Sequence, residues 1–409
     1  MQTAATVASL RNTFQALSNR HYRWLWLGRL ATATTFQMGN VVQGWLVYHL
    51  TGSAFALGWV GAGWSVSTLL LSPYGGVIAD RVDKRSLMLW SRIGMMANTL
   101  VLGLLISMGL IQVWHIALAS FFTGIFIAFL MPAQQAIISE LVEPHVLMNA
   151  MSVDALGMGL MGVISASVAG FVITAVGAQG VYFAMAGMYV IALYTILKLP
   201  KAPPRDGERA SVWSDLLGGA QYLRGNSILL TILGLGLVRV FFVMPYHALM
   251  PAFARNNMGF DAAGLGLLQS AAGVGALVAS LIACNMGDFQ GKGKLLVQIS
   301  VALGFCLIAY VTVPWVPMVF ILLAIIGGLN NLYMVLNNTL LLSNADPRYR
   351  GRVLSIALME FGLYPLGTIP SGAIADRVGV SLVVAAQGAV VASVFALVSK
   401  LKPGIKELR

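Results

Sequence analysis

The chain has 409 residues, of which 58% are hydrophobic and only 10% are charged, and its formal net charge is +11. A soluble domain carries about 25% charged residues, so the composition excludes a water-soluble globular protein and predicts that lipid is the main solvent. Cys284 and Cys306 lie in apolar runs without metal or redox spacing, so no metal site or cofactor is expected. The N-terminal segment lacks the apolar core of a cleavable signal, so the first apolar run is expected to be retained.

Apolar runs of about 20 residues, the length that crosses the hydrocarbon of a bilayer, recur along the whole chain. Because backbone groups in lipid must bond internally, each run predicts a helix. The fold class is therefore an all-α membrane protein with twelve transmembrane helices. The predicted spans are residues 23–49, 54–78, 87–110, 113–137, 150–175, 179–199, 227–252, 261–286, 294–313, 315–342, 353–375 and 378–399.

A polar stretch, KLPKAPPRDGERASVWSDLLGGAQYLRGN at 198–226, divides the spans into six plus six, and its second part fits a surface helix. The predicted organisation is an N-terminal six-helix bundle over 1–199, a cytoplasmic linker over 200–226 and a C-terminal six-helix bundle over 227–409. EPHVLMNAMS at 143–152 and DPRYRGRVLS at 346–355 follow the fourth and tenth spans. The two bundles are therefore expected to be pseudo-symmetric parallel repeats.

Basic residues set the orientation. All but four of the 25 lysines and arginines fall on the side of the membrane that holds both termini; Arg255 and Arg377 lie opposite, and Arg29 and Arg239 lie within spans. By the positive-inside rule, both termini are expected in the cytoplasm of a multi-pass protein of the plasma membrane, here a bacterial inner membrane. This bias also accounts for the net charge without a nucleic-acid partner.

Two stretches of the sequence are near copies. GGVIADRV at 75–82 follows the second span, and SGAIADRV at 371–378 follows the eleventh. Nine spans separate Asp80 from Asp376, so the two copies are expected on opposite faces. The second copy cannot do the work of the first in the same place.

The first copy is followed directly by Asp83, Lys84 and Arg85. Together they resemble the signature between the second and third spans of the major facilitator superfamily. YRWLWLGRL, WLVYHLTGSAFALGWV, MPAQQAIISELVEP and DPRYRGRVLS resemble its branch of enterobactin exporters and macrolide-efflux proteins. The resemblance covers nearly the whole chain and implies two bundles that rock around a central cavity. One departure concerns the fifth span, where GVISASVAG lacks the Gly-Pro pair that exporters often carry.

The resemblance implies a cytoplasmic gate. A small Gly76 lets the eleventh span approach, and Asp80 could accept bonds from the first turn of that span, where the helix dipole favours negative charge. The alternative is that the basic residues here only set topology. The predicted gate residues are Gly76, Asp80, Arg81, Lys84, Arg85 and Arg352.

Charges within spans are costly in lipid and mark a cavity or an ion pair. Four are predicted: Arg29, Asp154, Arg239 and Glu360. The spans that neighbour one another in the superfamily imply the pairs Arg29–Asp154 and Arg239–Glu360. A carboxylate whose cation is drawn away takes up a proton more readily, which would supply proton coupling. Static pairs, or snorkelling of Arg29 and Asp154, are the alternatives.

Polar and aromatic side chains recur at helical spacing on spans that line the cavity in this superfamily, and they suit a mixed polar and apolar ligand. Hydrogen bonding between helices is the alternative role, and a lone histidine is often only structural. The predicted cavity residues are Phe36, Asn40, Gln43, Phe242, Tyr246, His247, Asn330, Tyr333 and Asn337.

No enzyme signature is found. GDFQGKGK at 287–294 lacks the spacing of a phosphate-binding loop, so the chain is not expected to be an enzyme or an ATP-driven pump. The leading prediction is a monomeric secondary transporter that exports a siderophore- or drug-like small molecule by proton antiport, with substrate, protons and membrane lipid as partners. An uptake symporter or facilitator is the runner-up, and a membrane sensor or scaffold is a third reading.

Overall fold

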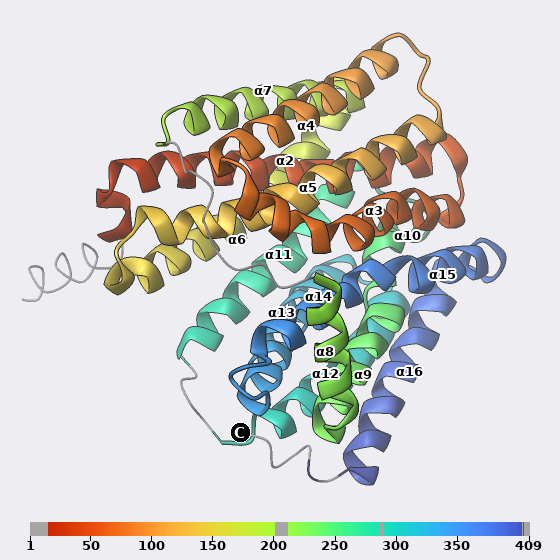
Figure 1. Ribbon diagram of the computed structural model, residues 1–409. Helices are drawn as coiled ribbons and strands as arrows, with labels where there is room; N and C mark the ends of the chain where they lie inside the picture. The colour runs from red at the N-terminus through yellow and green to blue at the C-terminus, as the bar shows by residue number, and fades with distance from the viewer. Residues whose placement is uncertain (1–14, 201–211, 286–289, 403, 405–409) are drawn as a thin grey trace, which may run out of the picture.

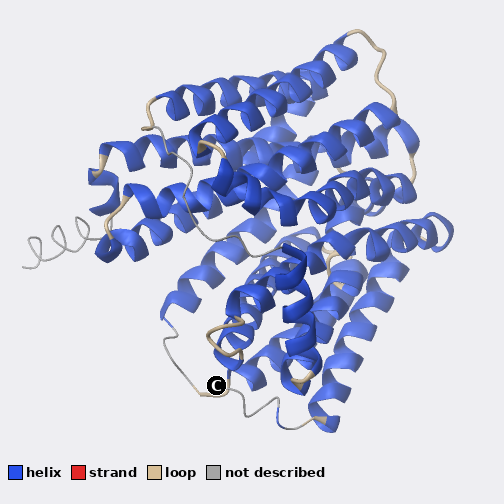
Figure 2. Ribbon diagram, viewed as in Figure 1, coloured by secondary structure: helices blue, strands red, loops and turns tan. Residues whose placement is uncertain are grey.

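The computed structural model describes residues 15–200, 212–285, 290–402 and 404, and every regular element in those ranges is a helix (Figure 2). The first group of long helices is α2 (Arg20–Thr51), α3 (Ala54–Arg81), α4 (Lys84–Ser107), α5 (Val113–Leu141), α6 (Pro144–Val176) and α7 (Ala178–Leu197). The short η1 (Gln15–Ser18) precedes them, and α8 (Val212–Arg224) follows them. The surface helix expected in the polar stretch is therefore present as α8.

The second group also makes six spans, although two of them are broken. One span is α9 (Ser227–Phe242) with α10 (Pro245–Met258), and another is α14 (Arg350–Met359), η2 (Glu360–Leu363) and α15 (Tyr364–Val378). The others are α11 (Ala262–Asn285), α12 (Lys292–Thr312), α13 (Val316–Asn344) and α16 (Val380–Leu401). Both breaks come just before a proline, Pro245 or Pro365, which cannot donate the next helical hydrogen bond.

Among the described residues, eleven helical segments are long and apolar enough to cross a membrane. The twelfth span is α2, which has 32 residues but carries several polar and basic side chains. It lies between α6 and α7 and so completes the first bundle. The prediction of twelve transmembrane helices in two six-helix bundles is confirmed, whereas the exact bundle boundaries stay a prediction.

Helices of each half pack mainly on one another, as α3 on α5 and α4 on α7 in the first, and α11 on α13 and α12 on α16 in the second (Figure 1). Glycines permit close approach: a methyl group on Gly304 would lie 2.5 Å from the carbonyl oxygen of Gly388. Two helix pairs make the most extensive contacts between the halves, α6 with α11 and α3 with α15.

We call the side of the molecule that contains the start of α2 and the end of α16 the terminal face, and the opposite side the distal face. The halves meet at the distal face, where Asn256 donates a hydrogen bond of 2.6 Å to the hydroxyl of Tyr48. A methyl group on Gly170 of α6 would lie 2.4 Å from the carbonyl oxygen of Ala262, at the start of α11. These contacts close the distal face around the cavity described next.

Candidate functional site

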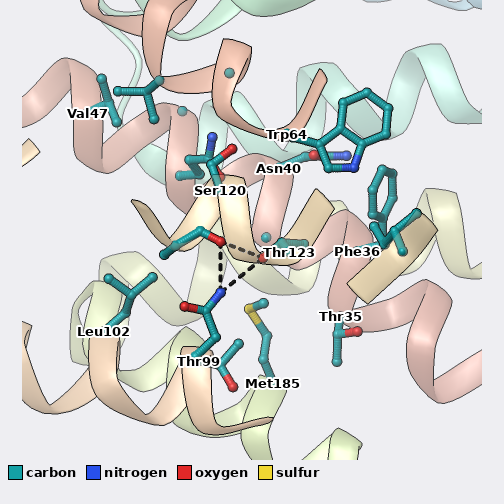
Figure 3. Close-up of a pocket in the computed structure, with 18 of the residues that line it drawn as sticks. Thr35, Phe36, Asn40, Val47, Trp64, Thr99, Leu102, Ser120, Thr123 and Met185 are labelled. Carbon is teal, nitrogen blue, oxygen red and sulfur yellow. Dashed lines mark hydrogen bonds between the residues drawn. The ribbon is translucent and has the colours of Figure 1, made fainter. Parts of the chain in front are cut away.

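A cavity of about 390 Å³ lies between the two halves, mostly against the first (Figure 3). Helices α2, α3, α4, α5 and α7 form one wall, and α10, α11, η2 and α15 contribute the other. The volume falls within the range of small-molecule sites, which is about 300–1,000 Å³. The cavity can therefore hold a small organic molecule in contact with both bundles.

The wall combines aromatic rings with neutral polar groups. Asn98 donates hydrogen bonds to the carbonyl oxygen of Ala119 at 2.8 Å and to the hydroxyl of Thr123 at 3.0 Å, so its amide holds α4 to α5. The indole nitrogen of Trp64, in contrast, is buried and has no hydrogen-bond partner among the described residues. A buried donor of this kind needs an acceptor, and a bound ligand could supply it.

No aspartate, glutamate, lysine or arginine is among the described residues that line this cavity. Among the described wall residues, His247 has the only ring that could carry a positive charge. The arrangement favours an uncharged, partly apolar region of a ligand, because a charged group here would lose its hydration without a counter-charge.

Four of the nine predicted cavity residues line this cavity, namely Phe36, Asn40, Gln43 and His247. The other five do not line it: Phe242, Tyr246, Asn330, Tyr333 and Asn337. Tyr246 and Tyr333 are 4% and 2% exposed, and the Tyr333 hydroxyl donates a hydrogen bond of 3.4 Å to Asn337. The polar stripe of α13 therefore packs into the core of the second half, as the helix-bonding alternative expects. Sequence reasoning missed Trp64, which no helical stripe marked.

Arg29 and Asp154 form the ion pair that the resemblance to the superfamily implies. Asp154 accepts hydrogen bonds from the Nε atom of Arg29 at 2.6 Å and from its Nη2 atom at 2.7 Å. Gln134 of α5 accepts a weaker bond of 3.4 Å from Nη1. Both charged residues are at most 8% exposed, so the pair fastens α2 to α6 within the first half.

Arg239 and Glu360 do not form the expected ion pair within the described part of the chain. Arg239 instead donates from Nε to Asn330 at 2.9 Å, and its guanidinium lies 5.5 Å from the ring centre of Tyr333 and 5.9 Å from that of Phe361. The carboxyl group of Glu360 lies against Gly236, where an added methyl group would clash with it. The expected ion pair is absent because the guanidinium of Arg239 contacts Asn330 and the rings of Tyr333 and Phe361 instead of the Glu360 carboxylate.

One carboxylate oxygen of Glu360 is buried and has no hydrogen-bond partner among the described residues. Its chain neighbour Phe361 and the following Tyr364 both line the cavity. Glu360 thus begins the η2 break in the span, one residue before a ring of the cavity wall, while its carboxyl group faces Gly236 of α9. Glu360 therefore combines a buried acceptor that lacks a partner among the described residues with a position at a break in its helix.

Two further cations are buried: Arg92, which is not among the predicted intramembrane charges, and Lys84, which is predicted only as a gate residue. Arg92 is fully buried in α4; its Nη1 atom donates to the carbonyl oxygen of Gly28 at 3.0 Å, and Nε and Nη2 have no partner among the described residues. Lys84 is also fully buried, with Nζ 3.3 Å from a carboxylate oxygen of Glu140. The sequence did indicate that Arg92 could be an intramembrane charge, because it lies five residues inside the predicted span 87–110.

The predicted gate residues are only partly described. The surroundings of Gly76 and the side chain of Asp80 lie outside the described part of the structure. Arg81 is exposed, and Arg85 donates to the carbonyl oxygen of Leu197 at 2.8 Å within its own half. Arg352 packs against Gly218 and Gly219 of α8 and lies 5.5 Å from the ring centre of Tyr349. At this face α14 thus contacts the linker helix α8.

The chain is similar in sequence to known bacterial transporters. The chain is 25% identical over 351 residues to the staphyloferrin A transporter of Staphylococcus aureus (strain NCTC 8325 / PS 47), covering 84% of this chain and 86% of that protein. It is 24% identical over 370 residues to macrolide efflux protein A of Streptococcus pyogenes, covering 87% and 90%. It is 22% identical over 371 residues to the multidrug efflux pump Tap of Mycolicibacterium fortuitum, covering 86% and 89%.

Solved structures share the fold. A bacterial homologue of the human lysosomal transporter Spinster, in an inward-facing and unoccupied conformation, matches with a TM-score of 0.74 at 14% identity over 95% of this chain and 98% of that one. A POT family transporter in complex with a thioalcohol-conjugated peptide matches with a TM-score of 0.77 at 13% identity, over 94% and 96%. The family model of the transmembrane secretion effectors matches residues 11–407, so the chain belongs to this family of the major facilitator superfamily, in its efflux branch.

Proposed function

We propose that the protein is a secondary active transporter that exports a siderophore- or drug-like molecule across the bacterial inner membrane by alternating access. The cavity between the bundles carries this proposal, because residues of both halves line it and contacts between the halves, such as Asn256 with Tyr48, close the distal face. With the termini in the cytoplasm, as the distribution of basic residues suggests, the distal face is the outer one. Rocking of the halves would then expose the cavity to each side in turn.

The substrate class follows from the relatives and from the cavity. The relatives are described as a staphyloferrin A transporter, macrolide efflux proteins and a multidrug efflux pump. The aromatic and neutral polar wall suits a molecule with a large uncharged region and at least one hydrogen-bond acceptor for Trp64. Predicted cavity residues Phe36, Asn40 and Gln43 are proposed as ligand contacts on α2.

Proton antiport is proposed as the driving force, with Glu360 as the proton carrier. One of its carboxylate oxygens is buried without a partner among the described residues, its chain neighbour Phe361 lines the cavity, and the buried Arg239 of α9 is the cation that can approach or leave it. Loss of a cation favours the protonated carboxyl group, and its return favours the ionised one. Movement of the halves could therefore exchange a proton for substrate. Arg29 and Asp154 already satisfy each other and are assigned a structural part.

Transport by the purified protein in liposomes tests this function. Staphyloferrin A and a macrolide are used as probes, and an outward or inward pH gradient is imposed. Antiport predicts that the probe accumulates against its gradient only in the compartment from which protons leave. Equal flux under both gradients would instead identify a facilitator, and accumulation together with protons would identify a symporter. No flux of either probe, in protein that remains folded, contradicts the proposal for these two substrates.

A further inference from the structure

The second copy of the Ala-Asp-Arg-Val motif forms a contact between the two halves. Both copies have the form Gly-x-Ile-Ala-Asp-Arg-Val, with Gly76 and Asp80 at the end of α3 and Gly372 and Asp376 at the end of α15. Helix α3 ends at the terminal face and α15 ends at the distal face. The two copies therefore stand at opposite ends of the same helix pair, and α3 and α15 lie against each other (Figure 1).

Asp376 caps the first turn of α3. Its carboxylate accepts hydrogen bonds from the backbone N–H of Ala54 at 2.6 Å and of Phe55 at 3.1 Å. It also accepts a bond of 2.5 Å from the hydroxyl of Ser53, the N-cap residue of that helix. The first N–H groups of a helix have no partner inside it, and the dipole favours negative charge there. One exposed carboxylate thus joins the halves through three bonds.

The glycine of the motif makes this cap possible. A methyl group on Gly372 would lie 2.4 Å from the carbonyl oxygen of Ala54, so another residue here would push α15 away from α3. Gly58 provides the matching space on α3, where a methyl group would lie 2.8 Å from the carbonyl oxygen of Thr368. Glycine brings the two backbones together, and the aspartate four residues later reaches the free N–H groups.

We infer that Asp376 is the latch that holds the distal gate closed, as the inverted counterpart of the latch predicted for Asp80. The two bonded helices belong to different halves, so the distal face cannot open unless all three bonds break. In the opposite state, Asp80 would cap the start of α14 at the terminal face. The motif would thus occur twice because each copy stabilises one of the two closed gates. This inference rests on the alternating access proposed above.

Distances between spin labels in the full-length protein test the latch directly. Met108, in the α4–α5 loop, and Trp315, in the α12–α13 loop, are exposed on the distal face of different halves, and each is replaced with cysteine for labelling. Cys284 and Cys306, the two native cysteines, are replaced with serine. The populations of short and long distances are measured in lipid without substrate or gradient, so the result does not depend on transport.

The variants show whether the loss of the Asp376 hydrogen bonds, rather than any substitution at the end of α15, opens the distal face. Asp376→Asn is expected to raise the ratio of open to closed distal face about five- to tenfold, the effect of losing a helix cap, and Ser53→Ala is expected to raise it less. Arg377→Gln, in the same exposed turn, is the matched control and should leave the ratio unchanged. Asp80→Asn should lower the ratio.

An unchanged distance distribution in Asp376→Asn, or an equal shift in Arg377→Gln, overturns the latch. Where Asp376→Asn does not fold, Ser53→Ala decides: no rise in the open population then overturns the proposal. A rise or no change in Asp80→Asn overturns the reciprocal relation of the two copies. Absence of flux in liposomes together with the expected shifts would remove the proposed export activity and leave the latch intact.

Discussion

Arg29 of α2 and Asp154 of α6 form a buried ion pair through two parallel hydrogen bonds of 2.6 and 2.7 Å. This two-point geometry matches the planar guanidinium to the carboxylate and fixes both side chains. The pair lies inside the first half, away from the cavity wall, since neither residue lines the cavity. Its expected effect is therefore on stability.

Replacing Asp154 with asparagine is expected to destabilise the protein strongly. The buried Arg29 would lose its counter-charge, which typically costs about 3–5 kcal/mol. Thermal unfolding in detergent, followed by intrinsic fluorescence, measures the loss. The double variant Arg29→Met with Asp154→Leu removes both charges and should recover most of the stability. If the double variant is as unstable as the single one, the pair acts through packing alone and this explanation is wrong.

Glu360→Gln is expected to uncouple transport from the proton gradient. Glutamine keeps the size of the side chain beside Gly236 but cannot exchange a proton. Accumulation of probe under a pH gradient should fall to background, whereas exchange of labelled for unlabelled probe at equal pH should continue. Both fluxes are measured in the same liposome preparation.

The matched control for Glu360 is Glu143→Gln, because the Glu143 side chain is 77% exposed in the α5–α6 loop. This variant should accumulate probe as the unmodified protein does. Continued gradient-driven accumulation in Glu360→Gln would show that another group carries the proton. Loss of both accumulation and exchange would point to a role for Glu360 in rocking or binding.

Trp64→Phe is expected to weaken ligand binding without changing the fold. Phenylalanine retains an aromatic ring on the cavity wall but lacks the buried N–H donor, so affinity for an acceptor-bearing ligand should fall about tenfold or less, the effect of one hydrogen bond. Titration of the detergent-solubilised protein with a radiolabelled macrolide measures the change. Trp90→Phe is the control, because Trp90 is 71% exposed and lies outside the cavity. Equal affinity in the two variants would show that the Trp64 indole N–H does not contact the ligand.

The sequence allowed the spans and the charges within them to be predicted, because apolar length and charge inside an apolar run are strong signals in lipid. The pairing of Arg29 with Asp154 comes from the resemblance to the superfamily, which implies that their spans are neighbours. The sequence did not allow the lining of the second half to be predicted. Helical spacing places Asn330, Tyr333 and Asn337 on one face of α13, but it does not say whether that face meets the cavity or another helix. The structure turns it inward, where Asn330 holds Arg239.

Arg239 and Glu360 show a second limit of sequence reasoning. Two opposite charges on neighbouring spans predict an ion pair, but the alternative partner Asn330 lies 91 positions away in the chain. Glu360 also begins the 3-10 segment η2, where the spacing of side chains differs from that of the straight α-helix on which the prediction is based. Likewise, the role of Asp376 depends on which helix start faces it across the bundles, and only the three-dimensional arrangement gives that helix.

The linker helix α8 is held to the second half by Tyr222. Its ring stacks on Tyr349 with ring centres 4.2 Å apart and planes at 2°, and its hydroxyl accepts a hydrogen bond of 3.0 Å from the backbone N–H of Asp346. Tyr222→Ala removes both contacts, so α8 should detach more often. Amide hydrogen exchange across 217–224 is expected to quicken about tenfold, given about 0.5–1.5 kcal/mol for the ring pair and a similar amount for the hydrogen bond.

Tyr222→Phe is the matched control, because it keeps the stacked ring and loses only the hydroxyl. Its exchange rate should lie between those of the unmodified protein and Tyr222→Ala. Exchange in the span α12, which Tyr222 does not reach, should stay the same in all three proteins and so reports that the bundle is intact. Equal protection of α8 in Tyr222→Ala and the unmodified protein would mean that Arg352, packed against Gly218 and Gly219, is sufficient to hold the helix.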